Sequence, residues 1–278
     1  MDALNYNREQ QLVDEYFDKR SEYWYDTYKQ KDVNGIVNQL RQTIALRYVD
    51  KLSLPKTARV LEIGCGAGSM AIALAQKGFA VDAVDHSSAM IELTKRHAQE
   101  NGVENRIRVA TEDVHGLTFN DQSFDLIIAL GVVGWLHDLN KALMEIKRVL
   151  KYGGYVILNS THAHALLNPL SIPFIEAFFR AREGWAIRNS QHKNAIPHFY
   201  LAKEFNQHLS EINLRIVDYT IFGFGPFIVM KHKLFSDHVE KKTQQKLQRY
   251  ADARLPLIRS AGTQNVVLAK KVNPKGLR

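Results

Sequence analysis

The chain has 278 residues, of which 45% are hydrophobic and 24% charged, and its one cysteine is Cys65. This composition is typical of globular proteins and excludes a disulfide scaffold or a low-complexity chain. The N-terminal residues lack the pattern of a secretory signal, and the longest apolar run, 126–135, is too short to span a membrane. The formal net charge of +8 is spread along the chain, which favours an ordinary soluble surface over a nucleic-acid site. We therefore expect a cytoplasmic protein with no integral membrane association.

Short β-rich runs alternate with helical stretches through the middle of the chain. The predicted strands are 59–63, 80–84, 106–110, 124–130, 155–159, 215–221 and 265–270. The predicted helices are 69–77, 87–101, 139–150, a stretch near 202–210 and another at about 235–254, and a turn is expected at 151–154. This alternation is typical of an α/β fold with a mostly parallel sheet and helices on both faces.

Three segments lie outside this alternation. Residues 1–57 are helical and rich in aromatic side chains, whereas 160–200 and 222–262 are long connections inside the domain 58–278. Long connections in compact domains are usually functional or disordered, and these are too apolar to be disordered. We interpret 1–57 as an N-terminal helical lid, and the two connections as inserted caps that form walls of a substrate pocket.

A glycine-rich motif, Glu62-Ile-Gly64-Cys-Gly66-Ala-Gly68, joins the first predicted strand to the first helix of the domain. Glycine allows a ligand to approach the backbone closely, and the helix N-terminus that follows favours an anionic group. The spacing is G-x-G-x-G, whereas dinucleotide sites have G-x-G-x-x-G. Asp85 ends the next strand, where an acidic side chain accepts hydrogen bonds from ribose hydroxyls. The pattern indicates a nucleoside-containing ligand.

At this point the sequence resembles the class I S-adenosylmethionine (SAM)-dependent methyltransferases. The matching stretches are Val60-Leu-Glu-Ile-Gly-Cys-Gly-Ala-Gly68, Val84-Asp-His-Ser87, Glu112-Asp-Val114, Phe124-Asp-Leu-Ile-Ile-Ala-Leu130 and Arg148-Val-Leu-Lys-Tyr-Gly-Gly154. They occur in the family's order over residues 58–160. The resemblance implies a Rossmann-like sheet of seven strands, the last of which is antiparallel.

The resemblance also implies roles for individual residues, with SAM as the cofactor. Gly64, Gly66 and Gly68, with Cys65 between them, would line its methionine part, and Glu62 would orient this loop or bind the ammonium through water. The remaining cofactor contacts implied by position are the ribose ligand Asp85, the adenine neighbours His86, Met90, Asp113 and Val114, and Leu130 beside the methionine. Met90 also has the spacing of an ordinary core residue.

The segment 16–28 is similar to the start of the family's small-molecule branch. In that branch the segment folds over SAM, which implies that Tyr28 contacts the cofactor and Tyr16 the substrate. The alternative is an amphipathic helix that places Phe17 and Trp24 in the core.

Methyl transfer to a hydroxyl gains from a base that takes up the proton, and histidine suits that task near neutral pH. His137 and His162 are our candidates, although His137 could instead shape the SAM pocket or cap the next helix. His162 and His164 form a pair without a third ligand, so we expect no metal site.

The inserted segments are rich in aromatic side chains, and ligand pockets are mostly apolar. We therefore expect a small lipophilic or aromatic acceptor. Oxygen is the first choice for the atom that receives the methyl group, and carbon is the second. The predicted acceptor contacts, in addition to Tyr16, are His164, Phe178, His198, Tyr200 and Phe224. The rival hypotheses are an RNA methyltransferase, motivated by the charge, and a non-catalytic binding module with this fold. The segment 130–134 lacks the tetrapeptide common in methyltransferases that act on exocyclic amines.

Overall fold

The computed structural model describes most of the chain outside the segment that follows the fifth strand. The described residues are 3–27, 33–161, 198, 200, 202–224, 228–229, 232–233, 236–253, 255, 258 and 262–273. The predicted site residues Tyr28, His162, His164 and Phe178 lie outside this set.

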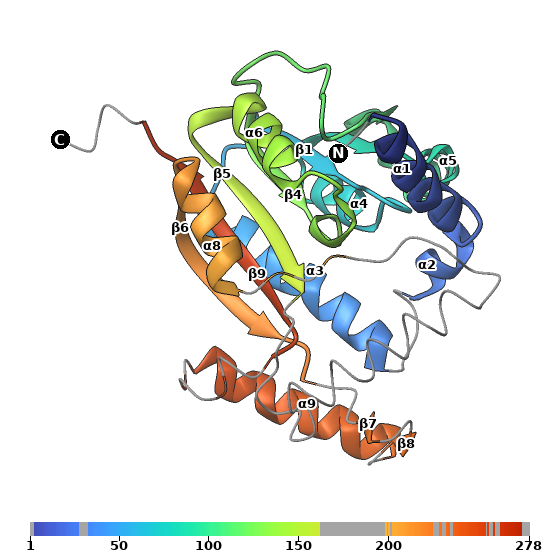
Figure 1. The fold of residues 1–278 in the computed structure, drawn as a ribbon, viewed down its shortest axis with the longest axis vertical. Coiled ribbons are helices and arrows are strands. Elements are labelled where there is room, and N and C mark those ends of the chain that lie inside the picture. The colour runs from blue at the N-terminus through green and yellow to red at the C-terminus, as the bar shows by residue number, and fades with distance from the viewer. Residues whose placement is uncertain are drawn as a thin grey trace.

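A seven-stranded sheet forms the centre of the molecule (Figure 1). Its strands are β1 (Arg59–Ile63), β2 (Ala80–Asp85), β3 (Ile107–Thr111), β4 (Phe124–Ala129), β5 (Leu150–Thr161), β6 (Leu214–Phe222) and β9 (Gln264–Lys271). They lie in the order β3-β2-β1-β4-β5-β9-β6, and β9 is antiparallel to both of its neighbours. This confirms the predicted fold class and the antiparallel last strand. The short strands β7 (Ile228–Val229) and β8 (His232–Lys233) pair separately.

Helices cover both faces of the sheet (Figure 1). The described α-helices are α1 (Ala3–Asp18), α2 (Ser21–Thr27), α3 (Val33–Leu52), α4 (Ser69–Gln76), α5 (Ser88–Glu100), α6 (Leu139–Val149), α8 (Ala202–Glu211) and α9 (Asp237–Asp252). One core cluster joins α3, α4 and α5 to the sheet, and the other joins α6 and α8 to the opposite face. Both faces of the central strands are therefore buried.

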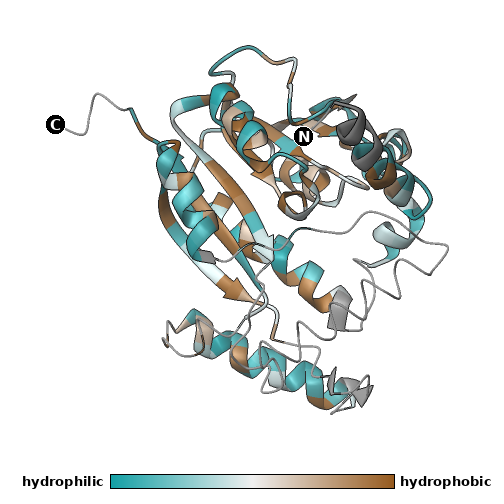
Figure 2. Cartoon of the chain, in the orientation of Figure 1, coloured by the Kyte–Doolittle hydropathy of each residue, from teal (hydrophilic) through white to brown (hydrophobic). Residues whose placement is uncertain are grey.

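The strand sequences explain this arrangement. In β1 the adjacent residues Val60 and Leu61 are both 0% exposed, yet they belong to the two different clusters. Successive side chains of a strand point to opposite faces, so a continuous apolar run suits a strand covered on both sides. Figure 2 shows these strands as mostly hydrophobic and α8 as mostly hydrophilic.

The predicted turn at 151–154 is wrong in one respect, because these residues belong to β5, which begins at Leu150. Phe124 pairs with Leu150 and Leu126 with Tyr155, so 151–154 form a bulge opposite a single residue of β4. Gly153 has φ +78°, a conformation that the glycine allows without strain. The glycine pair in this segment predicts a turn. It does not reveal that β5 pairs with β4 both before and after residues 151–154.

The predicted lid segment 1–57 divides into two parts. Ile44, Ala45 and Tyr48 of α3 are almost fully buried against the sheet, as core residues are. By contrast α1 and α2, hereafter the lid helices, pack beside α5 (Figure 1). Among the described helices, none is long and apolar enough to cross a membrane.

Candidate active site

A cavity of about 330 Å³ opens at the carboxyl ends of the central strands. Ile63 and Asp85 at the ends of β1 and β2, and Asn159 near the end of β5, contribute to its wall. The lid helices contribute Phe17 of α1 and Trp24 of α2 to its wall. Ligands of open α/β sheets bind at this edge, so the fold places the cavity where a ligand is expected.

The loop 64–68, hereafter the glycine loop, forms the floor of the cavity. All three of its glycines have positive φ, and Gly64 has φ +65°. A Cβ on Gly64 would lie 2.3 Å from Cγ2 of Val132, whereas a Cβ on Gly66 would meet no atom within 4 Å. Gly64 is therefore required by the close approach of the segment after β4. Gly66 instead leaves room beside its backbone, as a ligand needs.

Neighbouring elements hold the glycine loop at three points. The backbone N–H of Gly66 donates to Oδ2 of Asp85 at 2.9 Å, and Oγ1 of Thr94 donates to the Gly66 carbonyl at 2.7 Å. Nδ1 of His97 lies 2.9 Å from the Ala67 carbonyl, to which it donates. Contacts with β2 and α5 thus hold the loop in its conformation without the help of a ligand.

Glu62 is a buried carboxylate in the cavity wall, with 4% of its surface exposed. Burial, and then the nearby negative charge of Asp85, raise its pKa well above the usual range, while the Ala71 N–H opposes the shift. Within the described part of the chain, no group donates a hydrogen bond to its Oε2. A buried acceptor without a donor is costly, and a ligand ammonium would satisfy it.

Asp85 ends β2 as predicted. Its Oδ1 accepts from the Ser87 N–H at 3.0 Å, while Oδ2 accepts from Gly66. Burial raises its pKa, and these two N–H groups oppose that shift. A carboxylate has about four lone-pair positions, so capacity remains to accept from a diol.

The predicted adenine neighbours His86, Met90, Asp113 and Val114 all line the cavity. Oδ1 of Asp113 accepts from both the backbone N–H and Nδ1 of His115, the latter at 2.7 Å. His115, which sequence reasoning missed, therefore fixes the orientation of this carboxylate.

Aromatic side chains form a further part of the cavity wall. Phe17, Trp24 and Trp135 line it and are hereafter called the aromatic roof. The rings of Phe17 and Trp135 meet edge to face at 5.0 Å, and those of Phe17 and Trp24 lie 5.8 Å apart. Tyr16 stacks on Trp135 at 5.4 Å but is not among the lining residues. Phe17 and Trp24 thus act as cavity wall, which favours the lid interpretation over a plain core helix.

The predicted histidines are placed differently from one another. His137 does not line the cavity; its ring packs 3.6 Å from that of His115, and burial followed by His115 lowers its pKa to about 4. His198 does line the cavity, and its backbone N–H donates to the Gly134 carbonyl at 2.6 Å. Among the described residues, His86 and His198 are therefore the predicted histidines that line the cavity.

Two further predicted acceptor contacts, Tyr200 and Phe224, are not among the residues that line the cavity. Phe224 is 2% exposed in a separate cluster with Ile221 and Ala251, because the end of β6 packs against α9. Tyr200 packs against the core that contains Phe205. The structure does not bring either of them to the site.

Arg41 and Asn159 are among the polar residues of the cavity that sequence reasoning missed. Nη1 of Arg41 lies 3.1 Å from the position that a Cβ on Gly131 would take, and Oδ1 of Asn159 accepts from the Gly131 N–H. Both therefore gather at the end of β4. Asn159 could have been noticed as a polar residue ending a buried strand, whereas nothing in the sequence of α3 singles out Arg41. Across the described ranges, no group of three or more His, Cys, Asp or Glu side chains could hold a metal ion.

The comparison with protein families decides the identity. Residues 61–158 match the methyltransferase domain family. The chain contains a class I SAM-dependent methyltransferase domain. The matched range contains the glycine loop, Asp85 and Asp113, so the family's domain surrounds most of the cavity described above.

Individual relatives match different shares of the chain. It is 24% identical over 220 residues to a ubiquinone biosynthesis O-methyltransferase of Coxiella burnetii, covering 79% of this chain and 88% of that protein. It is 34% identical to the tRNA 5-carboxymethoxyuridine methyltransferase of Escherichia coli, over 46% of this chain and 51% of that one. A magnesium protoporphyrin IX methyltransferase of Synechocystis PCC 6803 with bound SAH superposes with a TM-score of 0.62 at 17% identity, covering 94% of this chain and 99% of that one.

Proposed function

We propose that this methyltransferase acts on a small lipophilic or aromatic acceptor and transfers the methyl group of SAM to a hydroxyl oxygen. One observation carries the proposal: the same cavity is lined by the glycine loop and by the aromatic roof. The similarity to an O-methyltransferase of ubiquinone biosynthesis supports this acceptor class.

The residues present fit SAM at the floor. Glu62 offers a buried carboxylate oxygen to the ammonium of the methionine part, and Arg41 offers a guanidinium to its carboxylate. Asp85 would accept from the ribose hydroxyls, and Asp113 from the adenine amino group. Bound SAM supplies a methyl group made electrophilic by its sulfonium. The protein's part is to hold the two reactants in line and exclude water.

The aromatic roof would hold the acceptor. Its three rings offer flat apolar surface at low entropic cost, and they exclude water from the space between the lid helices and the sheet. Thr161 and His198 lie in the same cavity and supply polar groups beside this surface. We assign to the His198 imidazole the uptake of the proton that the hydroxyl loses. The roles of Tyr28, His162, His164 and Phe178 remain predictions.

The test is to incubate the protein with ¹³C-methyl SAM and a cell extract, then to separate lipid-soluble molecules, water-soluble molecules, RNA and protein. We expect the label in the lipid-soluble fraction, with the NMR shift of a methoxy group. A C-methyl shift would overturn the oxygen assignment alone, and label in RNA or protein would overturn the acceptor class. Binding of SAM without transfer to any fraction would favour the non-catalytic module.

A further inference from the structure

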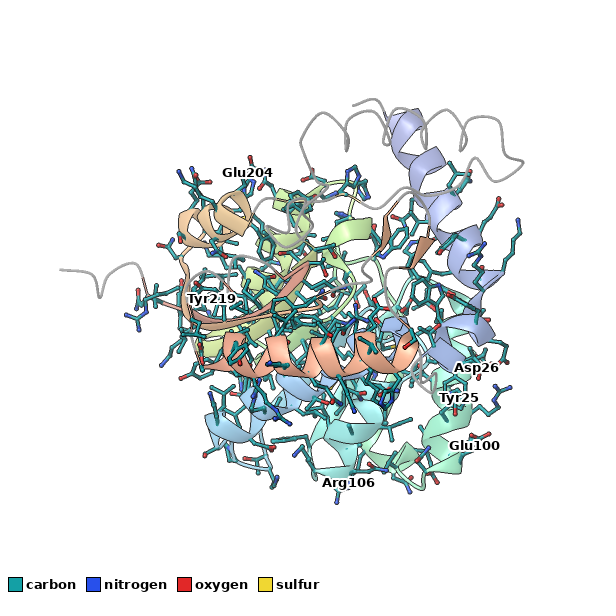
Figure 3. All side chains as sticks on the ribbon, turned by 90° about the horizontal axis from the view of Figure 1, so that it is seen from below. Tyr25, Asp26, Glu100, Arg106, Glu204 and Tyr219 are labelled. Carbon is teal, nitrogen blue, oxygen red and sulfur yellow. The ribbon has the colours of Figure 1, made fainter. Side chains whose placement is uncertain are left out.

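Helix α5 lies between the lid helices and the glycine loop. Towards the lid, Nδ1 of His86, which precedes the helix, pairs with Asp14 at 2.8 Å, and Arg96 pairs with Glu22 at 3.2 Å. Towards the loop, Thr94 donates to Gly66. Figure 3 shows the labelled Tyr25 of α2 near Glu100 at the end of α5. Helix α5 therefore connects the lid helices to the loop.

His97 is the α5 residue that contacts both sides. Its ring stacks on that of Tyr25, with centroids 3.8 Å apart and an angle of 17° between the planes. Its Nδ1 lies 2.9 Å from the Ala67 carbonyl. A carbonyl only accepts, so Nδ1 carries the proton and the ring orientation is set by the loop. His97 is 2% exposed, so this arrangement has little freedom to change.

The other lid contacts do not touch the loop directly. Oγ of Ser87 donates to Asp18 of α1, and this contact reaches Gly66 only through Asp85, which accepts from both the Ser87 and the Gly66 N–H. The Arg96–Glu22 pair has side chains 52% and 65% exposed, and such surface pairs contribute little. The His86–Asp14 pair is also partly exposed, and no described hydrogen bond links it to residues 64–68. Tyr25 itself lines the cavity, so its position is coupled both to the ligand space and to His97.

We propose that His97 is a positioning residue that couples the closed lid to the glycine loop. Stacking of Tyr25 fixes the imidazole, and the imidazole fixes the Ala67 carbonyl and the loop conformation that binds SAM. Coupling of this kind is reciprocal, so SAM on the loop also favours the docked lid. The inference rests on the proposed SAM site at the glycine loop.

The test is a double-mutant cycle on the SAM dissociation constant, measured by calorimetry on the full chain. H97N keeps an N–H donor near the Nδ1 position but removes the ring, and H97F keeps a ring but removes the donor. Y25A in the native background should weaken SAM binding by about threefold to tenfold, as expected for one aromatic pair. The same change in H97N should have an effect below about twofold, since the coupling is already lost.

R96Q is the matched control, because it removes a lid contact next to His97 that does not reach the loop. Y25A should keep its full effect in the R96Q background. Hydrogen exchange of residues 64–70 gives a second measurement: Y25A and H97F should both speed it, and R96Q should not.

Equal effects of Y25A in the native and H97N backgrounds would overturn the coupling and leave the SAM site intact, because Tyr25 would then act on the cavity directly. If H97N does not fold, unchanged exchange at 64–70 in Y25A overturns the coupling equally. A native protein that binds no SAM would overturn both this inference and the proposed function.

Discussion

The two sides of the cavity are built in different ways. On the cofactor side the glycine loop is anchored by a hydrogen bond to Asp85 and by hydrogen bonds from Thr94 and His97, all between elements of the core. On the lid side, ring contacts in the aromatic roof and partly exposed ion pairs hold α1 and α2 in place. Buried hydrogen bonds fix one geometry, whereas ring contacts and surface pairs allow several. The comparison indicates a rigid cofactor site beneath an adaptable acceptor wall.

The largest expected effect comes from the floor of the cavity. G64A should lower SAM affinity about 100-fold or more, because a positive φ and a contact of 2.3 Å with Val132 impose roughly 3 kcal/mol of strain where the ligand binds. The control is G102A, also at φ +65° but with no atom within 4 Å of the new Cβ. It should lower the melting temperature and keep the SAM dissociation constant. Equal SAM binding by both variants would contradict a floor role for the loop.

The next effect concerns the anchor of the loop. D85N replaces an acceptor of the Gly66 N–H and of the predicted ribose hydroxyls, so we expect SAM affinity to fall about 10- to 100-fold by calorimetry. D82N on the same strand is the control, because Asp82 pairs with Arg59 on the surface and does not line the cavity. A similar loss of SAM affinity in D82N would show that D85N acts by disturbing β2 as a whole and not by removing a ligand contact.

A smaller, selective effect is expected in the roof. W24A should raise the KM for the acceptor about tenfold, since it removes one of three apolar rings, and it should change the KM for SAM much less. Its neighbour Tyr23 is 48% exposed and serves as the matched control through Y23A. A rise in the KM for SAM alone would show that Trp24 contacts the cofactor and not the acceptor.

The smallest effect is a pH dependence of lid docking. The hydrogen bond to Asp14 is the main cause of the raised pKa of His86. A raised folded-state pKa means that the pair stabilises docking below about pH 6.5 and that this contribution is lost as the pH rises through the folded value. Hydrogen exchange of 3–18 should therefore speed up about threefold across that range, after correction for the intrinsic rate. D14N should remove this pH dependence. If the exchange of 3–18 in D14N depends on pH as in the native protein, another titrating group causes it.

The sequence predicts best those parts of the site that are formed by residues close together in the chain. The glycine spacing, Asp85 and the order of β1 to β5 are local patterns, and they predicted the cavity floor and the sheet. Arg41 and His97 could not be predicted, because their contacts join elements far apart in the chain. Phe224 shows the reverse error: an aromatic residue in a long connection was assigned to the pocket, but it covers apolar surface between β6 and α9.

His137 shows a related limit. Its position after β4 predicted a base near the acceptor, but its pKa of about 4 reflects burial and contact with His115. Position along the chain gave the correct end of the sheet and could not give the direction of the side chain. The residues around His137 decide that direction by packing.

The most direct test of the central claim is a crystal structure of the protein with S-adenosylhomocysteine. Our account predicts the ribose at Asp85, the adenine between His86 and Asp113, and the methionine part between Glu62 and Arg41, with its sulfur directed towards the aromatic roof. A nucleoside bound elsewhere, or a sulfur directed away from Phe17 and Trp24, would contradict the assignment of one cavity to both cofactor and acceptor.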